Sequence, residues 1–210
     1  ATSLSVSRTS DLGANVTTSG IQTYSGAVTL SGGTITLTTT DNQITFSDTV
    51  NSDAGQTRAL TLNVGSSEVE FNGAVGGSRT LGAIAITGAL DLNAAITNAT
   101  SLSVSRTSDL GANVTTSGIQ TYSGAVTLSG GIRTLTGSTI TTNGTIVGGG
   151  NSLTITGNAV FGDGTADTVT GVDILSVSGN TTIHTDTITT TGAQTYGDNA
   201  AVDTITLGNS

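Results

Sequence analysis

Apolar and polar residues alternate along this chain in short segments, and the same spacing recurs from one segment to the next. In one series an alternating apolar pair is followed six residues later by another apolar residue: Leu4, Val6 and Leu12; Ile84, Ile86 and Leu92; Leu102, Val104 and Leu110; Leu153, Ile155 and Phe161; Leu175, Val177 and Ile183. A second series reads Ile44, Phe46 and Val50, then Val69, Phe71 and Val75, then Leu90, Leu92 and Ile96. Alternation with a period of two is typical of half-buried strands. We therefore predict many short β-strands and no significant helix.

The segments between these strands are rich in Gly, Asn, Ser and Asp, as in SGG at 31–33, NGAVGGS at 72–78 and VGGGNS at 147–152. Such residues adopt positive φ or bond their own backbone, so they favour turns. Thr and Val dominate the strands, where branched side chains suit a pleated surface.

A long internal repeat organises the chain. Residues 1–33 recur letter for letter at 99–131, an offset of 98 residues, and VTTSGIQTY at 16–24 has a diverged third copy, ITTTGAQTY, at 188–196. We divide the chain into repeats at 1–98, 99–172 and 173–210, the last one partial, within a single continuous unit spanning 1–210. Such self-similarity is typical of repeat architectures.

The intervals between the tyrosines of these copies predict the architecture. Tyr24 and Tyr122 are 98 residues apart and Tyr122 and Tyr196 are 74 apart, a difference of 24 that matches one coil of a solenoid. A solenoid can lose a whole coil because each coil contacts only its neighbours. Aromatic residues, at 3%, are too few for the thick core of a β-sandwich. We predict an all-β parallel solenoid of about 8 to 10 coils, roughly 40 to 50 Å long at one strand spacing per coil.

Charge and composition exclude several roles. The formal charge is −9, with five Arg and no Lys, so binding to nucleic acid is not expected. No apolar run reaches about 18 residues, so no membrane insertion is expected, and the first residues lack the features of a signal peptide. Neither end has a polar capping segment, which suggests either a piece of a longer chain that continues the solenoid or a subunit that associates end to end.

At the QTY copies and at VEFNGAVGGSRTLGAIAITG (69–88), the sequence resembles the repeat regions of large bacterial surface proteins of the filamentous haemagglutinin type. The resemblance covers essentially the whole chain, although the amino-terminal secretion domain of that family is not present. It implies a right-handed parallel β-helix exported through an outer-membrane partner to the bacterial cell surface. It also implies a role in adhesion and biofilm formation, with a host-cell or carbohydrate surface as partner.

Candidate sites are few. Asp163 and Asp167 in FGDGTADT are candidate calcium ligands, with a solvated turn as the favoured interpretation. The single histidine, His184, lacks identifiable partners. Glu68 and Glu70 flank Val69 and so point to one side of a strand, which fits either paired catalytic carboxylates or, more simply, surface charges. We expect no metal, no cofactor and no catalytic residues.

Tyr24, Tyr122 and Tyr196 fit either a surface row for stacking on sugars or, as we favour, residues that close a coil with the hydroxyl in solvent. Gln22, Gln120 and Gln194 are expected to stack or to bond the turns.

Three functions remain open. The first is a structural or adhesive extracellular rod or filament, which is not an enzyme. The second is a carbohydrate-binding or polysaccharide-degrading β-helix. The chain has no lysine, and its arginines lie mostly in turns, which argues against this function. The third is an ice-binding solenoid, suggested by Thr34, Thr36 and Thr38 and by Thr185, Thr187 and Thr189. Ice binding needs alternating threonines in register on every coil, and residues 58–100 contain only isolated threonines.

Overall fold

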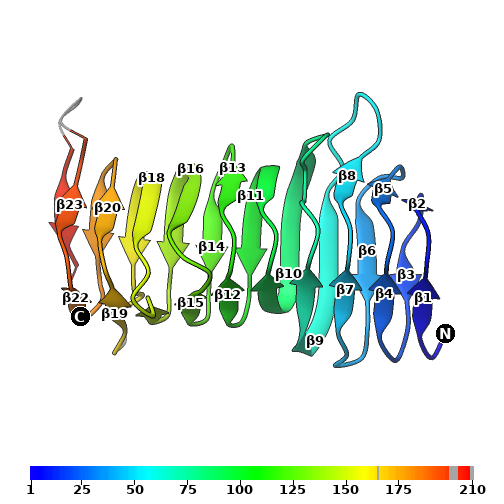
Figure 1. The fold of residues 1–210 in the computed structure, drawn as a ribbon, viewed down its shortest axis with the longest axis horizontal. Coiled ribbons are helices and arrows are strands. Elements are labelled where there is room, and N and C mark those ends of the chain that lie inside the picture. The colour runs from blue at the N-terminus through cyan, green and yellow to red at the C-terminus, as the bar shows by residue number, and fades with distance from the viewer. Residues whose placement is uncertain (165, 199–202, 209–210) are drawn as a thin grey trace.

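Every strand pairing in the computed structural model is parallel, and the chain forms a solenoid of about ten coils, with no helix among the described residues. The structure describes residues 1–164, 166–198 and 203–208. The amino terminus lies at one end of the stack and the last strand at the other (Figure 1). The all-β parallel solenoid predicted from the sequence is therefore confirmed.

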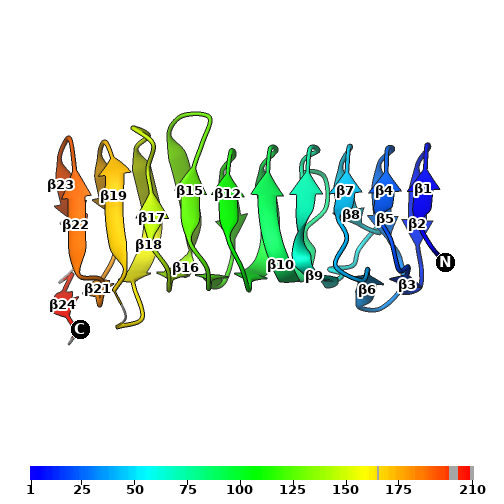
Figure 2. The same cartoon turned by 90° about the horizontal axis from the view of Figure 1, so that it is seen from below.

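Each coil contributes strands to three faces, which we name A, B and C in chain order. Figure 2 shows the strands of face A side by side along the stack. Face A comprises β1 (Leu4–Val6), β4 (Gln22–Tyr24), β7 (Ile44–Phe46), the second halves of β9 (Leu60–Phe71) and β10 (Leu81–Leu92), β12 (Ser108–Leu110), β15 (Val126–Leu128), β17 (Ile146–Val147), β19 (Thr168–Val172) and β22 (Thr187–Thr190).

Face B comprises β2 (Ser10–Leu12), β5 (Val28–Leu30), β8 (Val50–Ser52), the bridge at Val75, the start of β11 (Ile96–Val104), β13 (Val114–Thr116), the first halves of β16 (Arg133–Thr142) and β18 (Leu153–Phe161), β20 (Leu175–Val177) and β23 (Gln194–Tyr196). Face C comprises β3 (Val16–Thr17), β6 (Ile35–Thr38), the first halves of β9 and β10, the end of β11, β14 (Gln120–Tyr122), the second halves of β16 and β18, β21 (Thr181–Ile183) and β24 (Ile205–Leu207).

Coil length varies because the corners, and not the strands, absorb insertions. Paired residues are 18 positions apart at Leu4 and Gln22 but 25 apart at Ile44 and Val69. The strands are not all short as predicted, since β9 and β10 each run for 12 residues around a corner. Gly88, at φ 151°, lies where the register of β10 shifts, and this break lets the strand turn the corner without ending.

The interior is the thin, layered core that the composition predicts. It is filled by inward-facing Val, Ile and Leu side chains stacked in columns along the axis. The rings of Tyr24, Phe46 and Phe71 stack on successive coils of face A, with centroids 5.3 and 5.1 Å apart. Like side chains therefore meet along the long direction, as expected for a parallel solenoid with its strands in register.

Identical sequences occupy different faces of this solenoid. The QTY motif lies on face A at β4, on face C at β14 and on face B at β23. The first motif is separated from the second by four coils and two faces, and the second from the third by three coils and two faces. The two intervals thus differ by one coil, which accounts for the 24-residue difference between the tyrosine spacings.

Candidate functional site

Each QTY motif forms a hydrogen-bonded unit, which we call the Gln–Tyr unit; the first two lie inside the core and the third, at Gln194 and Tyr196, is largely exposed. Gln22 and Tyr24 both point inward because they are two residues apart on a strand. The Tyr24 hydroxyl donates to Gln22 Oε1 at 3.0 Å, and the Gln22 amide donates at 2.9 Å to Thr38 O at the end of β6. Gln120 and Tyr122 repeat these contacts at 3.0 and 2.8 Å, the latter to Thr136 O.

For Tyr24 and Tyr122, the surface row and the hydroxyl in solvent are both wrong, whereas packing on a neighbouring coil is confirmed at Tyr24, whose ring stacks on that of Phe46. Tyr24 and Tyr122 are both 0% exposed, so they form no surface row for sugars. Their hydroxyls do not reach solvent, because the preceding glutamine accepts the hydrogen bond inside the core. Burial raises the pKa of Tyr24 to about 12 and that of Tyr122 above its usual range. The Gln22 and Gln120 amides donate to the carbonyls of Thr38 and Thr136, which lie on strands β6 and β16, so the glutamines bond strands and not turns through these contacts.

The candidate calcium ligands lie in the turn between β18 and β19. The Asp167 carbonyl accepts hydrogen bonds from the Asp186 amide and the Thr185 hydroxyl, and this ties the turn to the next coil. His184 follows β21, and its amide donates to Phe161 O. Among the described residues, no three His, Cys, Asp or Glu side chains gather as a metal-binding group.

Acidic side chains form a column on the outer surface of face A. Glu70, Asp91 and Asp109 are paired on successive coils, and Glu68 lies beside them on β9. As expected, Glu68 and Glu70 flank a buried Val69, and the Gln43 amide donates to both carboxylates at 3.2 Å. Desolvation raises the pKa of Asp91, and the charges of Asp109 and Glu70 add to this effect.

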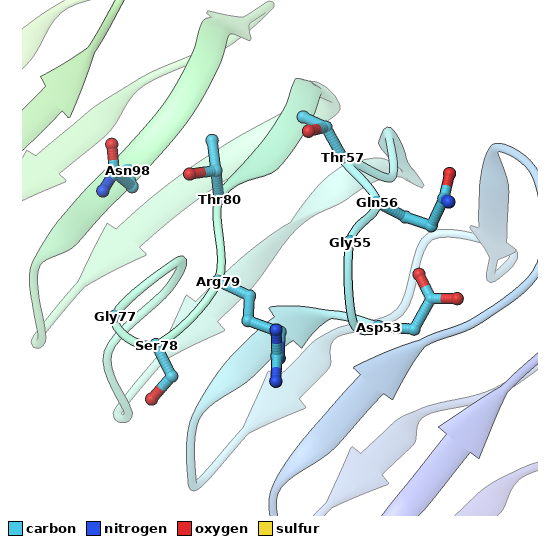
Figure 3. A pocket seen from close by; sticks show the side chains of 9 residues that line it. All are labelled: Asp53, Gly55, Gln56, Thr57, Gly77, Ser78, Arg79, Thr80 and Asn98. Atoms are coloured by element: carbon cyan, nitrogen blue, oxygen red, sulfur yellow. The ribbon is translucent and has the colours of Figure 1, made fainter.

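The described residues form a polar hollow of about 250 Å³. It lies between the loop after β8 and the loop before β10, and it is lined by Asp53, Gly55, Gln56, Thr57, Gly77, Ser78, Arg79, Thr80 and Asn98 (Figure 3). The first loop projects beyond the stack in Figure 1. Ser52 anchors both loops, since its hydroxyl donates to Thr80 O and accepts from the Arg58 amide, each at 2.8 Å.

An ion pair fixes one wall of the hollow. The Arg58 guanidinium donates to both Asp53 carboxylate oxygens at 2.8 and 2.9 Å. These bonds lower the pKa of Asp53, and the charge of Arg79 contributes to the shift. The hollow thus offers one guanidinium, two amides and several hydroxyls, but its single carboxylate is held by Arg58. It can bind a polar ligand by hydrogen bonding, and it lacks the pair of acids that glycoside hydrolysis uses.

Sequence reasoning missed the role of Arg133. This residue replaces the equivalent of Ile35 in the second repeat, begins β16 and is only 8% exposed, so it does not lie in a solvated turn. Its guanidinium donates to Gly130 O at 2.8 Å and to the carbonyls of Gly131 and Gly111. It therefore closes a glycine-rich turn by satisfying carbonyls that the strands leave unpaired.

Face C carries no formal charge on any of its strands in the described chain. Its central outward positions are paired from coil to coil in one column: Thr36, Thr61, Ala85, Ser103, Thr121, Thr141, Val160, Thr182 and Thr206. Thr34, Thr36 and Thr38 belong to this face, whereas Thr187 and Thr189 lie on face A. The threonines that look isolated in the sequence are therefore partly aligned in space.

No helix in the described residues is long and apolar enough to span a membrane. Comparison with protein-family models, with curated proteins and with solved structures finds no match for this chain.

Proposed function

We propose that this chain is a structural and adhesive segment of an extracellular repeat protein, which forms a stiff rod at a bacterial cell surface. The observation that carries the proposal is the unbroken stack of parallel coils, in which a single chain builds a long rigid body around a narrow core. The resemblance to filamentous haemagglutinin-type repeats supplies the cell surface as the location. The hollow beside β8 offers a single carboxylate, Asp53, which Arg58 holds, so we propose no enzymatic role for it.

The test separates shape from adhesion. X-ray scattering of the purified chain should give the profile of a rod whose length corresponds to ten coils, about 45 to 50 Å. Beads coated with the chain should bind bacterial or host cells more strongly than beads coated with a solenoid of unrelated surface. A compact scattering profile would refute the rod, and equal binding by both beads would refute adhesion.

Carbohydrate binding is a second candidate, favoured by the hollow beside the Asp53–Arg58 ion pair. Its amide, hydroxyl and guanidinium groups suit an uncharged or acidic sugar, since such groups fix a polyol by hydrogen bonds. Arg79→Ala should weaken glycan-array binding, whereas Arg8→Ala, on a distant corner, should not. Equal binding by the two variants would remove the hollow as the site.

Ice binding is a third candidate, favoured by the uncharged column on face C. Regularly spaced hydroxyl and methyl groups present a flat pattern to water, although Ala85 and Val160 interrupt the threonines. Measurable thermal hysteresis that is lost in Thr121→Lys would support this function. A freezing point equal to that of a matched solution of albumin would exclude it.

A further inference from the structure

Two of the five arginines of the chain lie at the polar hollow between the loop after β8 and the loop before β10. Arg79 lines the hollow, and Arg58 pairs with Asp53 in its wall. Asp53 is the single carboxylate of the lining, so these three side chains together carry one excess positive charge. The whole chain has a formal charge of −9, and its acidic column lies on face A, away from this corner between faces B and C. The hollow is therefore locally cationic on an acidic molecule.

The Arg79 guanidinium is placed to receive a ligand. Arg58 donates to both oxygens of the Asp53 carboxylate, at 2.8 and 2.9 Å, so this carboxylate already has its counterion. Within residues 1–164, 166–198 and 203–208, the Arg79 guanidinium makes no ion pair or hydrogen bond, and the side chain is exposed. Figure 3 shows this side chain extending from the loop before β10 into the space between the two loops.

The backbone that carries Arg79 is held in place before any ligand binds. The amides of Ser78 and Arg79 both donate to Asn51 Oδ1, at 2.9 and 3.1 Å. The Ser52 hydroxyl donates to Thr80 O at 2.8 Å. Both contacts come from β8, so a strand of the stack fixes the loop on either side of Arg79. A site that is already ordered loses less conformational entropy when it binds.

The rest of the lining supplies neutral hydrogen-bonding groups around an open space. The polar side chains are hydroxyls and amides, and the described lining has no aromatic ring: Gln56, Thr57, Ser78, Thr80 and Asn98. Nothing lies within 4 Å of a Cβ built on Gly55, so this side of the hollow is not filled by protein. Hydroxyls and amides bind a polyol, and a guanidinium fork binds a planar carboxylate through two parallel hydrogen bonds. A sugar that carries a carboxylate combines both kinds of group.

We propose that the hollow binds a uronic acid unit of an acidic polysaccharide, with the sugar carboxylate on the Arg79 guanidinium. The inference rests on the carbohydrate binding proposed above as the second candidate function, and it names the class of sugar that the hollow selects. A neutral sugar forms no ion pair with Arg79, and a cationic sugar is repelled by it. The acidic column on face A repels a polyanion, so the polymer is held at the corner between faces B and C.

Binding to polygalacturonate and to its methyl ester tests the charge of the ligand. The two polymers have the same sugar backbone, and esterification removes only the negative charge. Biolayer interferometry with each polymer immobilised should give an affinity for polygalacturonate at least about tenfold higher than for the ester, because the ester cannot pair with the guanidinium. Added sodium chloride should weaken binding to the acid more than binding to the ester, since it screens an exposed ion pair.

Variants of exposed residues locate the binding site. Arg79→Gln keeps an amide donor but no charge, and it should lower the affinity for polygalacturonate about tenfold. Arg106→Gln is the matched control, because it removes the same charge from an exposed arginine between β11 and β12, at the corner between faces C and A, and should leave the affinity unchanged. Ser78→Glu is a second variant, which adds a carboxylate to the lining and should weaken binding by a similar factor. Circular dichroism should give the same β signal for all of these proteins.

Three results would overturn the inference. These are equal affinity for the acid and the ester, equal affinity of Arg79→Gln and Arg106→Gln for polygalacturonate, and no binding of polygalacturonate. If the ester binds as well as the acid and Arg79→Gln weakens both, carbohydrate binding at the hollow stands while selection by charge fails. If neither polymer binds and no glycan on an array depends on Arg79, both the inference and the candidate function on which it rests fail.

Discussion

At the scale of single residues, the most informative feature is a tyrosine hydroxyl that is stable in an aliphatic core. Tyr122 is fully buried, yet its hydroxyl donates to Gln120 Oε1, and the Gln120 amide is used by three acceptors. A buried polar group without a partner costs about 1 to 3 kcal/mol. The Gln–Tyr unit is therefore stable in the core only while both the Tyr122 hydroxyl and the Gln120 side chain keep their hydrogen-bond partners.

Tyr122→Phe should therefore destabilise the chain, because it leaves Gln120 Oε1 buried and unpaired. We expect a loss of about 1 to 3 kcal/mol in the free energy of unfolding, measured in urea. Tyr196→Phe is the matched control, since Gln194 Oε1 can bind water and the loss should be smaller. Equal losses at the two positions would contradict the role assigned to burial.

The acidic column on face A gives stability a pH dependence at Asp91. Burial raises the pKa of this carboxyl in the folded state, so ionisation is less favourable there than in the unfolded chain. Stability is therefore reduced as the pH rises from the unfolded pKa, near 4, through the raised folded value. Asp91→Asn should raise the urea midpoint at pH 7, and the gain should vanish towards pH 4.

Asp11→Asn is the control for this prediction. Asp11 is the sequence twin of Asp109 but pairs with Thr29, so no carboxylate lies on the adjacent strand. Its substitution removes the same charge, and we expect a smaller gain in the urea midpoint at pH 7 than Asp91→Asn gives. An equal effect of the two substitutions would show that total charge, and not the column, controls the pH dependence.

At the scale of elements, glycines at the corners let long strands turn without losing their pairing. Gly157 lies inside β18 at φ 131°, and a Cβ on it would come within 1.9 Å of Gly137 O on the preceding coil. A side chain therefore meets both backbone strain and a steric clash.

Gly157→Ala should destabilise the chain by about 1 to 3 kcal/mol, the cost of a strained backbone position. Gly33→Ala is the matched control, because its φ is not in the left-handed region and nothing lies within 4 Å of the added Cβ. That substitution should be neutral or stabilise by up to about 1 kcal/mol. Urea midpoints that shift equally would contradict the steric account of the corner.

The long repeat provides a test of how far one coil influences another. Leu102→Ala opens a cavity between two covering coils, and such substitutions cost about 2 to 5 kcal/mol. Leu4→Ala changes the identical sequence at the first coil, where the side chain is only partly buried, so the measured loss should be clearly smaller. A similar loss of stability for Leu4→Ala and Leu102→Ala would mean that the cost of the substitution does not depend on whether a preceding coil covers the side chain.

The strands and their inward residues could be predicted because alternation with a period of two is a local property. The face on which each strand lies could not be predicted, because coil length varies, for example from 18 to 25 residues, and identical motifs fall on different faces. The buried hydroxyl at Tyr24 was missed although a signal existed, as Gln22 precedes it by two residues and must point the same way. The polar hollow was beyond prediction, because its two loops are brought together only by the stacking of coils.

At the scale of the whole molecule, the charge of −9 is unevenly distributed over three faces of the same construction. Face A carries the acidic column and face C carries no charge on its described strands, yet both are built from the same strand motifs. Outward residues can therefore vary without changing the core. In a rod of this kind, stability depends on the inward columns, while the residues on the outer faces and corners can change with little effect on it.

Distances between spin labels test the central claim, the parallel stack of coils, most directly. The chain has no cysteine, so pairs can be introduced cleanly at outward positions of face A. Pulsed electron resonance should give about 29 Å between labels at Ser5 and Thr127, six coils apart, and about 38 Å between Ser5 and Thr170, eight coils apart, at about 4.8 Å per coil. Distances that do not increase with the number of coils would contradict the solenoid.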